Sequence, residues 1–140
     1  MSQRQIREIL EKYRVIAIVG LSPDENKPSN HVASYMQQNG YRIIPINPFV
    51  EEVLGEKSYK NLLEVPAEIQ KTIEIVDIFR RPADVQPIVE QVVKLKEVNG
   101  KPFVVWMQLG IVNQQAAETA RKAGLIVVMD MCIMVEHRNL

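Results

Sequence analysis

The 140-residue sequence contains a single cysteine and has no excess of either charge. Each of these features excludes some classes of protein. Its single cysteine, Cys132, excludes an internal disulfide and fits a reducing compartment, so a cytoplasmic protein is expected. Lys plus Arg and Asp plus Glu each number 17, which leaves no global field to attract nucleic acid. No apolar run approaches the roughly 20 residues of a membrane helix, and no secretion signal is visible after Met1. We therefore expect neither a nucleic-acid partner nor a membrane.

Patterns for metal binding and catalysis are also missing. His31 and His137 are far apart in the sequence, and the sequence contains no Cys-x-x-Cys motif. No pair of carboxylates has a spacing that demands a cation. Ser22 has no identifiable general-base partner, and a loop position suits phosphate binding better than nucleophilic attack. We therefore predict no metal site and no catalytic residue.

What the sequence does contain is a strand, loop and helix near its start. Val15 to Val19 is an apolar run closed by Gly20, which predicts a strand buried on both faces. A glycine at the end of a strand lets backbone come close to a ligand. The helix that opens at Ser29 points its unpaired N–H groups and the positive end of its dipole toward this loop, which favours an anion such as phosphate.

The rest of the chain alternates strands with helices, as in a single domain over residues 1–140. Strands are predicted at 15–19, 41–46, 73–79, 103–108 and 125–129, and helices at 3–12, 29–39, 84–99, 113–124 and 131–137. Helices of this length between strands imply right-handed crossovers, a parallel sheet and three layers. The expected strand order is 3-2-1-4-5, with a switch point between strands one and four. The partial alternation in 73–79 predicts one less buried face.

The ligand of such a sheet lies beyond the carboxyl ends of its strands, at the switch point. A dinucleotide site would open G-x-G-x-x-G at Gly20 and carry an acidic residue after the second strand. Ser22 and Asn47 stand at those two positions, which argues against NAD. The nearby cationic side chains suit a ligand with several phosphates, and they are Lys27, His31, Arg80 and Arg81.

Taken together, five segments at this rim resemble motifs of the small stand-alone CoA-binding proteins, which are similar to the CoA-binding domain of the succinyl-CoA synthetase α subunit. The segments are Gly20-Leu21-Ser22-Pro23, Ile46-Asn47-Pro48, Phe79-Arg80-Arg81-Pro82, Trp106-Met107-Gln108-Leu109-Gly110-Ile111 and 130–137. The resemblance covers nearly the whole chain. It implies a Rossmann-like fold and coenzyme A as the ligand.

Carried over residue by residue, the resemblance implies a CoA-binding role for most of these positions. The residues expected to hold the diphosphate are Gly20, Leu21, Ser22 and Pro23, with Lys27 close by. Those expected to form the neighbouring wall and the adenosine side are Asn47, Pro48, Phe79, Arg80, Arg81, Pro82 and Val85. Those expected to face the pantetheine arm are Gln108 and Gly110. For Cys132 the favoured interpretation is a half-buried cysteine packed as a small apolar side chain, and the alternative is a cysteine at a strand end that faces the thiol of CoA.

The leading hypothesis is a protein that binds CoA, free or as acyl-CoA, without catalysis of its own. The chain lacks the second domain that carries the phosphorylated histidine of the synthetases, which argues against acyl-CoA synthesis by this chain alone. Three alternatives stay open: a subunit that presents CoA to a separate catalytic subunit, an NAD(P)-dependent oxidoreductase, and a redox regulator in which Cys132 forms a mixed disulfide with CoA. Homodimerisation is also left open.

Overall fold

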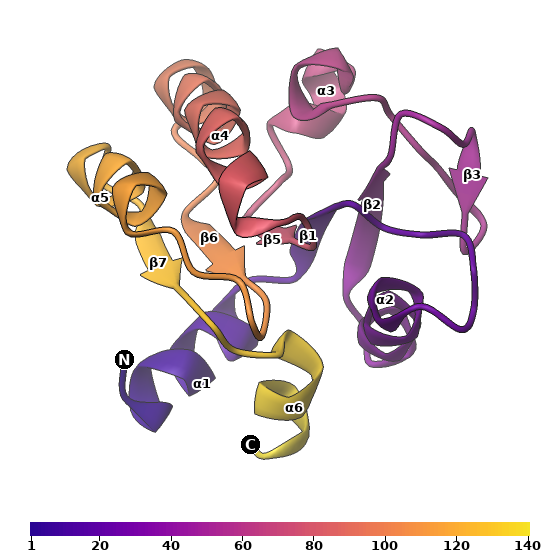
Figure 1. Ribbon diagram of the computed structural model, residues 1–140, viewed down its shortest axis with the longest axis horizontal. Coiled ribbons are helices and arrows are strands. Elements are labelled where there is room, and N and C mark those ends of the chain that lie inside the picture. Colours follow the sequence, from indigo (N-terminus) through magenta and orange to yellow (C-terminus); the bar gives the residue numbers. More distant parts are fainter.

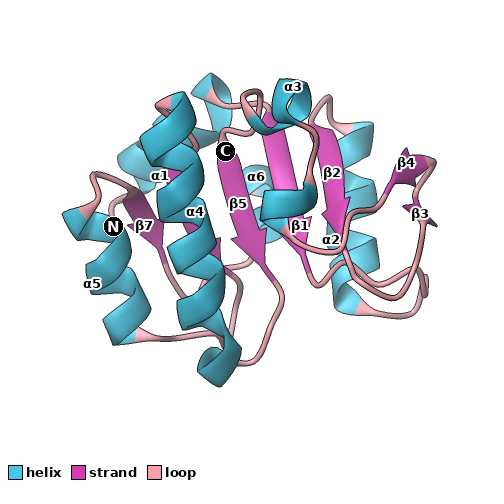
Figure 2. Cartoon of the chain, turned by 90° about the horizontal axis from the view of Figure 1, so that it is seen from above, coloured by secondary structure: helices cyan, strands magenta, loops and turns pink.

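Five parallel strands form the central layer of the computed structural model, which describes residues 1–140 (Figures 1 and 2). They are β1 (Val15–Val19), β2 (Arg42–Ile46), β5 (Ile75–Ile78), β6 (Val104–Met107) and β7 (Ile126–Val128). Every pairing between neighbours in this sheet is parallel, so all five carboxyl ends lie along one edge. A separate two-stranded hairpin, β3 (Glu52–Val53) and β4 (Glu56–Lys57), lies beside β2.

Helices cover both faces of the sheet (Figure 1). One face carries α1 (Gln3–Lys12), α2 (Pro28–Gln38) and α6 (Ile133–Arg138), and the other carries α3 (Ala67–Gln70), α4 (Val85–Asn99) and α5 (Gln114–Lys122). Two 3-10 turns, η1 (Leu62–Glu64) and η2 (Pro82–Asp84), precede α3 and α4. The predicted three-layer α/β class with a parallel sheet is confirmed. None of the helices combines the length and apolar character needed to cross a bilayer.

The order of the strands corrects the prediction. Along the sheet it is β2-β1-β5-β6-β7, so the third predicted strand pairs with β1 and does not lie beyond β2. Pro45 explains the difference, because a proline has no N–H for a second neighbouring strand. The Pro45 carbonyl accepts a hydrogen bond from the Tyr59 N–H on the outer side of β2, so the missing N–H faces that side too. β2 is therefore an edge strand, and the switch point lies between β1 and β5.

The burial of β5 also differs from the prediction. All four of its residues are buried, so neither face is open to solvent. Asp77 is completely buried there and no hydrogen-bond partner satisfies its carboxylate oxygens. Burial raises the pKa of Asp77 well above its usual value. The alternation in this strand therefore places an unpaired carboxyl in the core.

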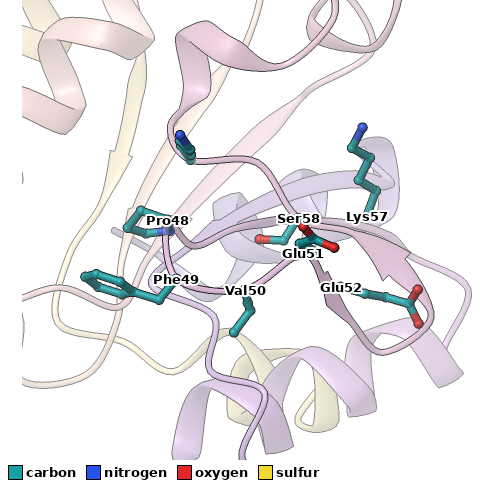
Figure 3. Close-up of a pocket in the computed structure, with 8 residues that line it drawn as sticks. Pro48, Phe49, Val50, Glu51, Glu52, Lys57 and Ser58 are labelled. Atoms are coloured by element: carbon teal, nitrogen blue, oxygen red, sulfur yellow. The ribbon is translucent and has the colours of Figure 1, made fainter.

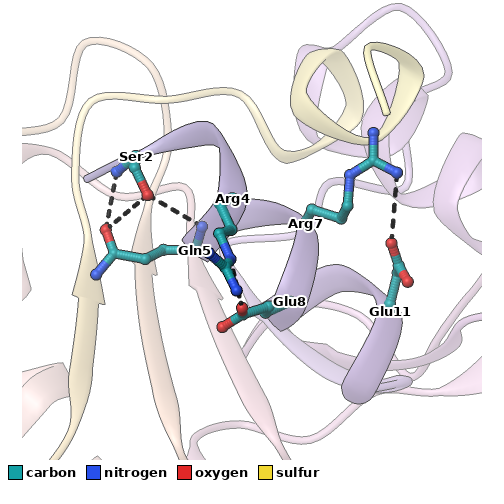
Figure 4. A network of polar contacts seen from close by, with 6 residues as sticks. All are labelled: Ser2, Arg4, Gln5, Arg7, Glu8 and Glu11. Carbon is teal, nitrogen blue, oxygen red and sulfur yellow. Dashed lines mark hydrogen bonds and ion pairs between the residues drawn. The ribbon is translucent and has the colours of Figure 1, made fainter.

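The first helix follows its sequence pattern closely (Figure 4). The Ser2 hydroxyl accepts a hydrogen bond from the Gln5 N–H at 3.2 Å, and the Gln5 side chain accepts one from the Ser2 N–H at 2.9 Å, which completes a capping box. The outer face carries two exposed ion pairs, Arg4–Glu8 and Arg7–Glu11. The inner face buries Ile6, Ile9 and Leu10.

Candidate functional site

The loops after β1 and β5 touch at the switch point, and Gly20 is the residue that allows it. Its φ is +89°, a conformation that side chains with a Cβ rarely adopt. A Cβ at this position would lie 2.5 Å from the Phe79 carbonyl oxygen and 3.0 Å from Cδ of Arg80. Gly20 therefore lets two loops that follow adjacent strands meet with no side chain between them.

Hydrogen bonds hold the loop after β1 in place. The Ser22 N–H donates to Ser29 Oγ, and the Asn30 side-chain amide donates to the Ser22 carbonyl, both at 2.9 Å. The Asn47 side-chain amide donates to the Leu21 carbonyl at 2.9 Å, which ties this loop to the one after β2. Because Ser29 and Asn30 are themselves buried, the loop has a fixed shape before any ligand arrives.

The start of α2 faces the same loop. Lys27 precedes the helix without a side-chain cap, and Pro28 occupies its first turn. The N–H groups of Ser29 and Asn30 have no hydrogen-bond acceptor. Unpaired N–H groups and the positive end of the helix dipole make this a favourable place for an anion.

Two hollows lie along the carboxyl edge, and Arg80 lines both. The α2-side hollow has a volume of about 430 Å³ and is mostly apolar. Its lining residues are Pro28, Val32, Phe79, Arg80, Gln108, Leu109, Ile111 and Cys132. The α4-side hollow has a volume of about 180 Å³, and its lining residues are Val19, Gly20, Ile46, Pro48, Lys60, Asn61, Leu62, Arg80, Ile88 and Gln91. An apolar and a cationic hollow thus adjoin at the switch point.

Two hydrogen bonds anchor the chain around Cys132, which forms part of the wall of the α2-side hollow. The buried Gln108 side chain accepts a hydrogen bond from the Ile133 N–H at 3.0 Å. The Trp106 indole N–H donates to the Met131 carbonyl at 2.8 Å. These two contacts fix the chain on either side of Cys132, which is half-buried in the wall of the hollow.

The two arginines after β5 differ in position. Both contact Asp84, Arg80 through Nη2 at 3.2 Å and Arg81 through Nε at 3.1 Å. The hydrogen bond from Arg81 is the main reason that the pKa of Asp84 lies below its usual value, and the positive charges of Arg81 and Arg80 act in the same direction. The Arg81 side chain is 83% exposed and lines neither hollow, whereas that of Arg80 is 43% exposed and lines both.

The structure brings together some of the predicted site residues and separates others. Those that line one of the two hollows are Gly20, Pro48, Phe79, Arg80, Gln108 and Cys132. The side chains of Leu21 and Val85 are fully buried in the core and face no cavity. The remaining predicted residues lie in the surrounding loops or, for Pro82, at the start of η2, and they line neither hollow; they are Ser22, Pro23, Lys27, Asn47, Arg81, Pro82 and Gly110. The binding roles of all these residues stay predictions.

Several lining residues were not predicted from the sequence as part of the site. Pro28 and Val32 lie on the helix whose start was already predicted to bind an anion. The sequence therefore gave a partial signal for these two residues. Leu109 and Ile111 belong to the motif after β6, within which only Gln108 and Gly110 were singled out. Lys60, in contrast, lies in the long connection after β2, where no motif distinguishes it from other surface lysines.

The largest hollow, of about 710 Å³, lies outside the switch point (Figure 3). Its lining residues are Pro48, Phe49, Val50, Glu51, Glu52, Lys57, Ser58 and Lys60. The two glutamates offset the two lysines, so this surface offers no net attraction to a polyanion. It adjoins the α4-side hollow through Pro48 and Lys60, which line both.

Comparison with known proteins finds relatives along almost the whole chain. A family model described as a CoA binding domain matches residues 14–138. The protein YneT of Bacillus subtilis (strain 168) is 38% identical over 136 residues, which are 97% of this chain and 94% of YneT. One similar solved structure is that of a hypothetical protein from Pyrococcus horikoshii OT3, which is 40% identical in sequence and has a TM-score of 0.90. The match covers 100% of this chain and 92% of the Pyrococcus horikoshii chain.

A larger protein also matches. The alpha subunit of the ADP-forming acetate–CoA ligase II from Pyrococcus furiosus is 28% identical over 139 residues. The match covers 91% of this chain but only 29% of the ligase subunit. This chain is therefore similar to one part of that subunit.

Proposed function

This chain belongs to the CoA-binding domain family, and we propose that it binds coenzyme A across the carboxyl edge of its sheet, at the switch point between β1 and β5. The family predicted from the five motifs is thus the one that the comparisons find. CoA combines a long pantetheine arm with a phosphorylated nucleotide, so a matching site needs an apolar part and an anion-binding part.

The observation that carries the proposal is the meeting of two unlike hollows at Arg80. The pantetheine arm lies in the mostly apolar α2-side hollow, with its thiol end toward Cys132. The diphosphate lies near Ser22 and the start of α2, where unpaired N–H groups and the helix dipole favour negative charge. The nucleoside end extends past Gly20 toward the α4-side hollow.

Binding without catalysis is the role that the lining residues support. Neither hollow is lined by a histidine or a carboxylate that would serve as a general base. Cys132 is the one nucleophilic side chain in the α2-side hollow, and it has no base beside it there. Free CoA and acyl-CoA both fit this role.

A second candidate function is the presentation of CoA to a separate catalytic subunit. It is favoured by the similarity of this chain to one part of a ligase alpha subunit. Co-purification from the source cells would identify such a partner. Recovery of an ATP-grasp-type subunit supports this function, and recovery of the chain alone argues against it.

Calorimetric titration of the purified protein with CoA, acetyl-CoA, dephospho-CoA and NAD tests the binding proposal. We expect heat of binding from CoA and no detectable heat from NAD. Arg80→Ala should weaken CoA binding by about 1.5–3 kcal/mol, as for other hydrogen bonds to charged groups. Arg4→Ala is the matched control, because Arg4 also pairs with an exposed carboxylate, that of Glu8, but lines neither hollow and is not among the predicted site residues. Preference for NAD, or the absence of CoA binding, would refute the proposal.

A further inference from the structure

We infer that Lys60 acts with Arg80 to bind the ribose 3′-phosphate of the ligand, and so distinguishes CoA from its dephosphorylated form. This inference rests on the proposed CoA binding and adds to it a residue that sets specificity. Lys60 belongs to none of the motifs, and only the folded chain brings it beside Arg80. The two cations come from opposite sides of the switch point, one from the connection after β2 and one from the loop after β5.

The charge of the α4-side hollow is the first support. Lys60 and Arg80 both line it, and no carboxylate does. Lys60 has no carboxylate within ion-pair distance, whereas Arg80 shares Asp84 with Arg81. Lys60 therefore has no direct ion-pair partner in the protein, although Glu51 and Glu52 line the largest hollow with it, and a bound anion would be its first direct partner.

The chemistry of the ligand is the second support. A phosphomonoester carries about −1.5 to −2 charge at neutral pH, more than either phosphate of an internal diphosphate. Two cations at one hollow therefore match the charge of one terminal monoester. At about 180 Å³ the hollow lies below the roughly 300–1,000 Å³ that is usual for a small-molecule site, so it takes one group of the ligand rather than the whole.

The backbone that carries Lys60 is the third support, because it is fixed on both sides. The Tyr59 carbonyl accepts a hydrogen bond from the Asn47 N–H at 2.9 Å, which joins it to the end of β2. The Asn61 side chain accepts hydrogen bonds from the N–H groups of Leu63 and Glu64 at 2.9 and 3.2 Å. Little backbone conformational entropy is then lost when Lys60 contacts a ligand.

Calorimetry of the full chain with CoA and dephospho-CoA tests the inference. Lys60→Ala should raise the Kd for CoA about 10-fold or more and that for dephospho-CoA less than about 2-fold, as expected for the loss of one charge-assisted contact. Lys60→Arg should retain most of the difference between the two ligands. Lys57→Ala is the matched control, because Lys57 is also exposed, lies over the Tyr59 ring and does not line the α4-side hollow.

The outcomes separate this inference from the function on which it rests. CoA binding by the unaltered protein, with equal losses for both ligands in Lys60→Ala or with no loss for CoA, overturns the inference alone. Absence of CoA binding by the unaltered protein overturns the proposed function and the inference with it. An unchanged thermal unfolding curve for Lys60→Ala, expected because Lys60 is exposed, excludes a folding defect as the cause.

Discussion

The two faces of the central sheet bury different kinds of side chain. The cluster of 20 buried residues under α4 and α5 consists mainly of valine, isoleucine, leucine and alanine, and the buried unpaired polar atoms of α4, Gln86 Oε1 and Asn99 Nδ2, belong to side-chain amides that do not ionise. The opposite face, under α1, α2 and α6, encloses polar groups among its apolar residues. They include the Trp106 indole N–H, the unpaired carboxyl of Asp77, and the Tyr35–His137 hydrogen bond.

The face under α4 and α5 therefore contributes mainly to the stability of the fold, whereas the face under α1, α2 and α6 also positions the site. Val76 and Ile78 belong to the apolar cluster, so Asp77, between them in β5, faces the other side. The polar contacts on that side hold α6 and the chain before it, which form one wall of the α2-side hollow. We therefore expect stability from the α4 side to be independent of pH, and stability from the α6 side to depend on it.

The largest expected effect is the loss of packing on the α4 side. Leu95 is buried in the apolar cluster, and Leu95→Ala should lower the free energy of unfolding by about 2–5 kcal/mol through lost burial and an unfilled cavity. The loss should be the same at pH 5 and pH 8. Val98→Ala, at a position 81% exposed on the same helix, should change it by less than about 0.5 kcal/mol. Denaturant unfolding measures both, and a loss for Leu95→Ala that varies with pH would remove the contrast between the faces.

Asp77→Asn should give the next largest effect, and in the opposite direction. Because the pKa of Asp77 is raised in the fold, the folded chain retains a proton that the unfolded chain releases above about pH 3.8. The contribution of Asp77 to stability is therefore full below that pH and falls as the pH rises. An asparagine side chain cannot ionise, so at pH 8 the variant should be more stable than the unaltered protein, in which Asp77 must either keep a proton or bury a charge. At pH 4 the difference should be smaller; an equal difference at both values contradicts this account.

Trp106→Phe tests whether the polar contacts on the α6 side of the sheet, called here the polar face, hold the wall of the α2-side hollow in place. The variant loses the hydrogen bond to the Met131 carbonyl, and the free energy of unfolding should fall by about 1–2 kcal/mol. The chain that carries Cys132 should become less fixed, so faster amide hydrogen exchange is expected at residues 131–133. Exchange confined to the α4 side would show that the indole does not anchor this wall.

How much of the fold and of the site could be predicted from the sequence depends on how far apart in the sequence the interacting residues lie. The strands, the helix ends and the family follow from local patterns, such as the Ser2 capping box and the motif at Gly20. The strand order did not follow, although Pro45 marks β2 as an edge strand and its significance could have been seen. Lys60 and Asp77 could not be assigned from the sequence, because only the folded chain determines what lies beside each of them.

The smallest effect expected is at the contact that ties α6 to α2. The Tyr35 hydroxyl and His137 Nδ1 form a hydrogen bond of 2.8 Å, so Tyr35→Phe should cost about 0.5–1.5 kcal/mol at pH 8. Burial, and to a lesser extent the charge of Arg14, lowers the pKa of His137, so the fold favours its neutral form. Stability from this group is therefore full above about pH 6.5, the ordinary value for histidine, and declines as the pH falls below it. His137→Gln should flatten that decline, whereas His31→Gln, at the other and exposed histidine, should leave it unchanged. If both variants keep the decline between pH 7 and pH 5, the pH dependence of the polar face has another source.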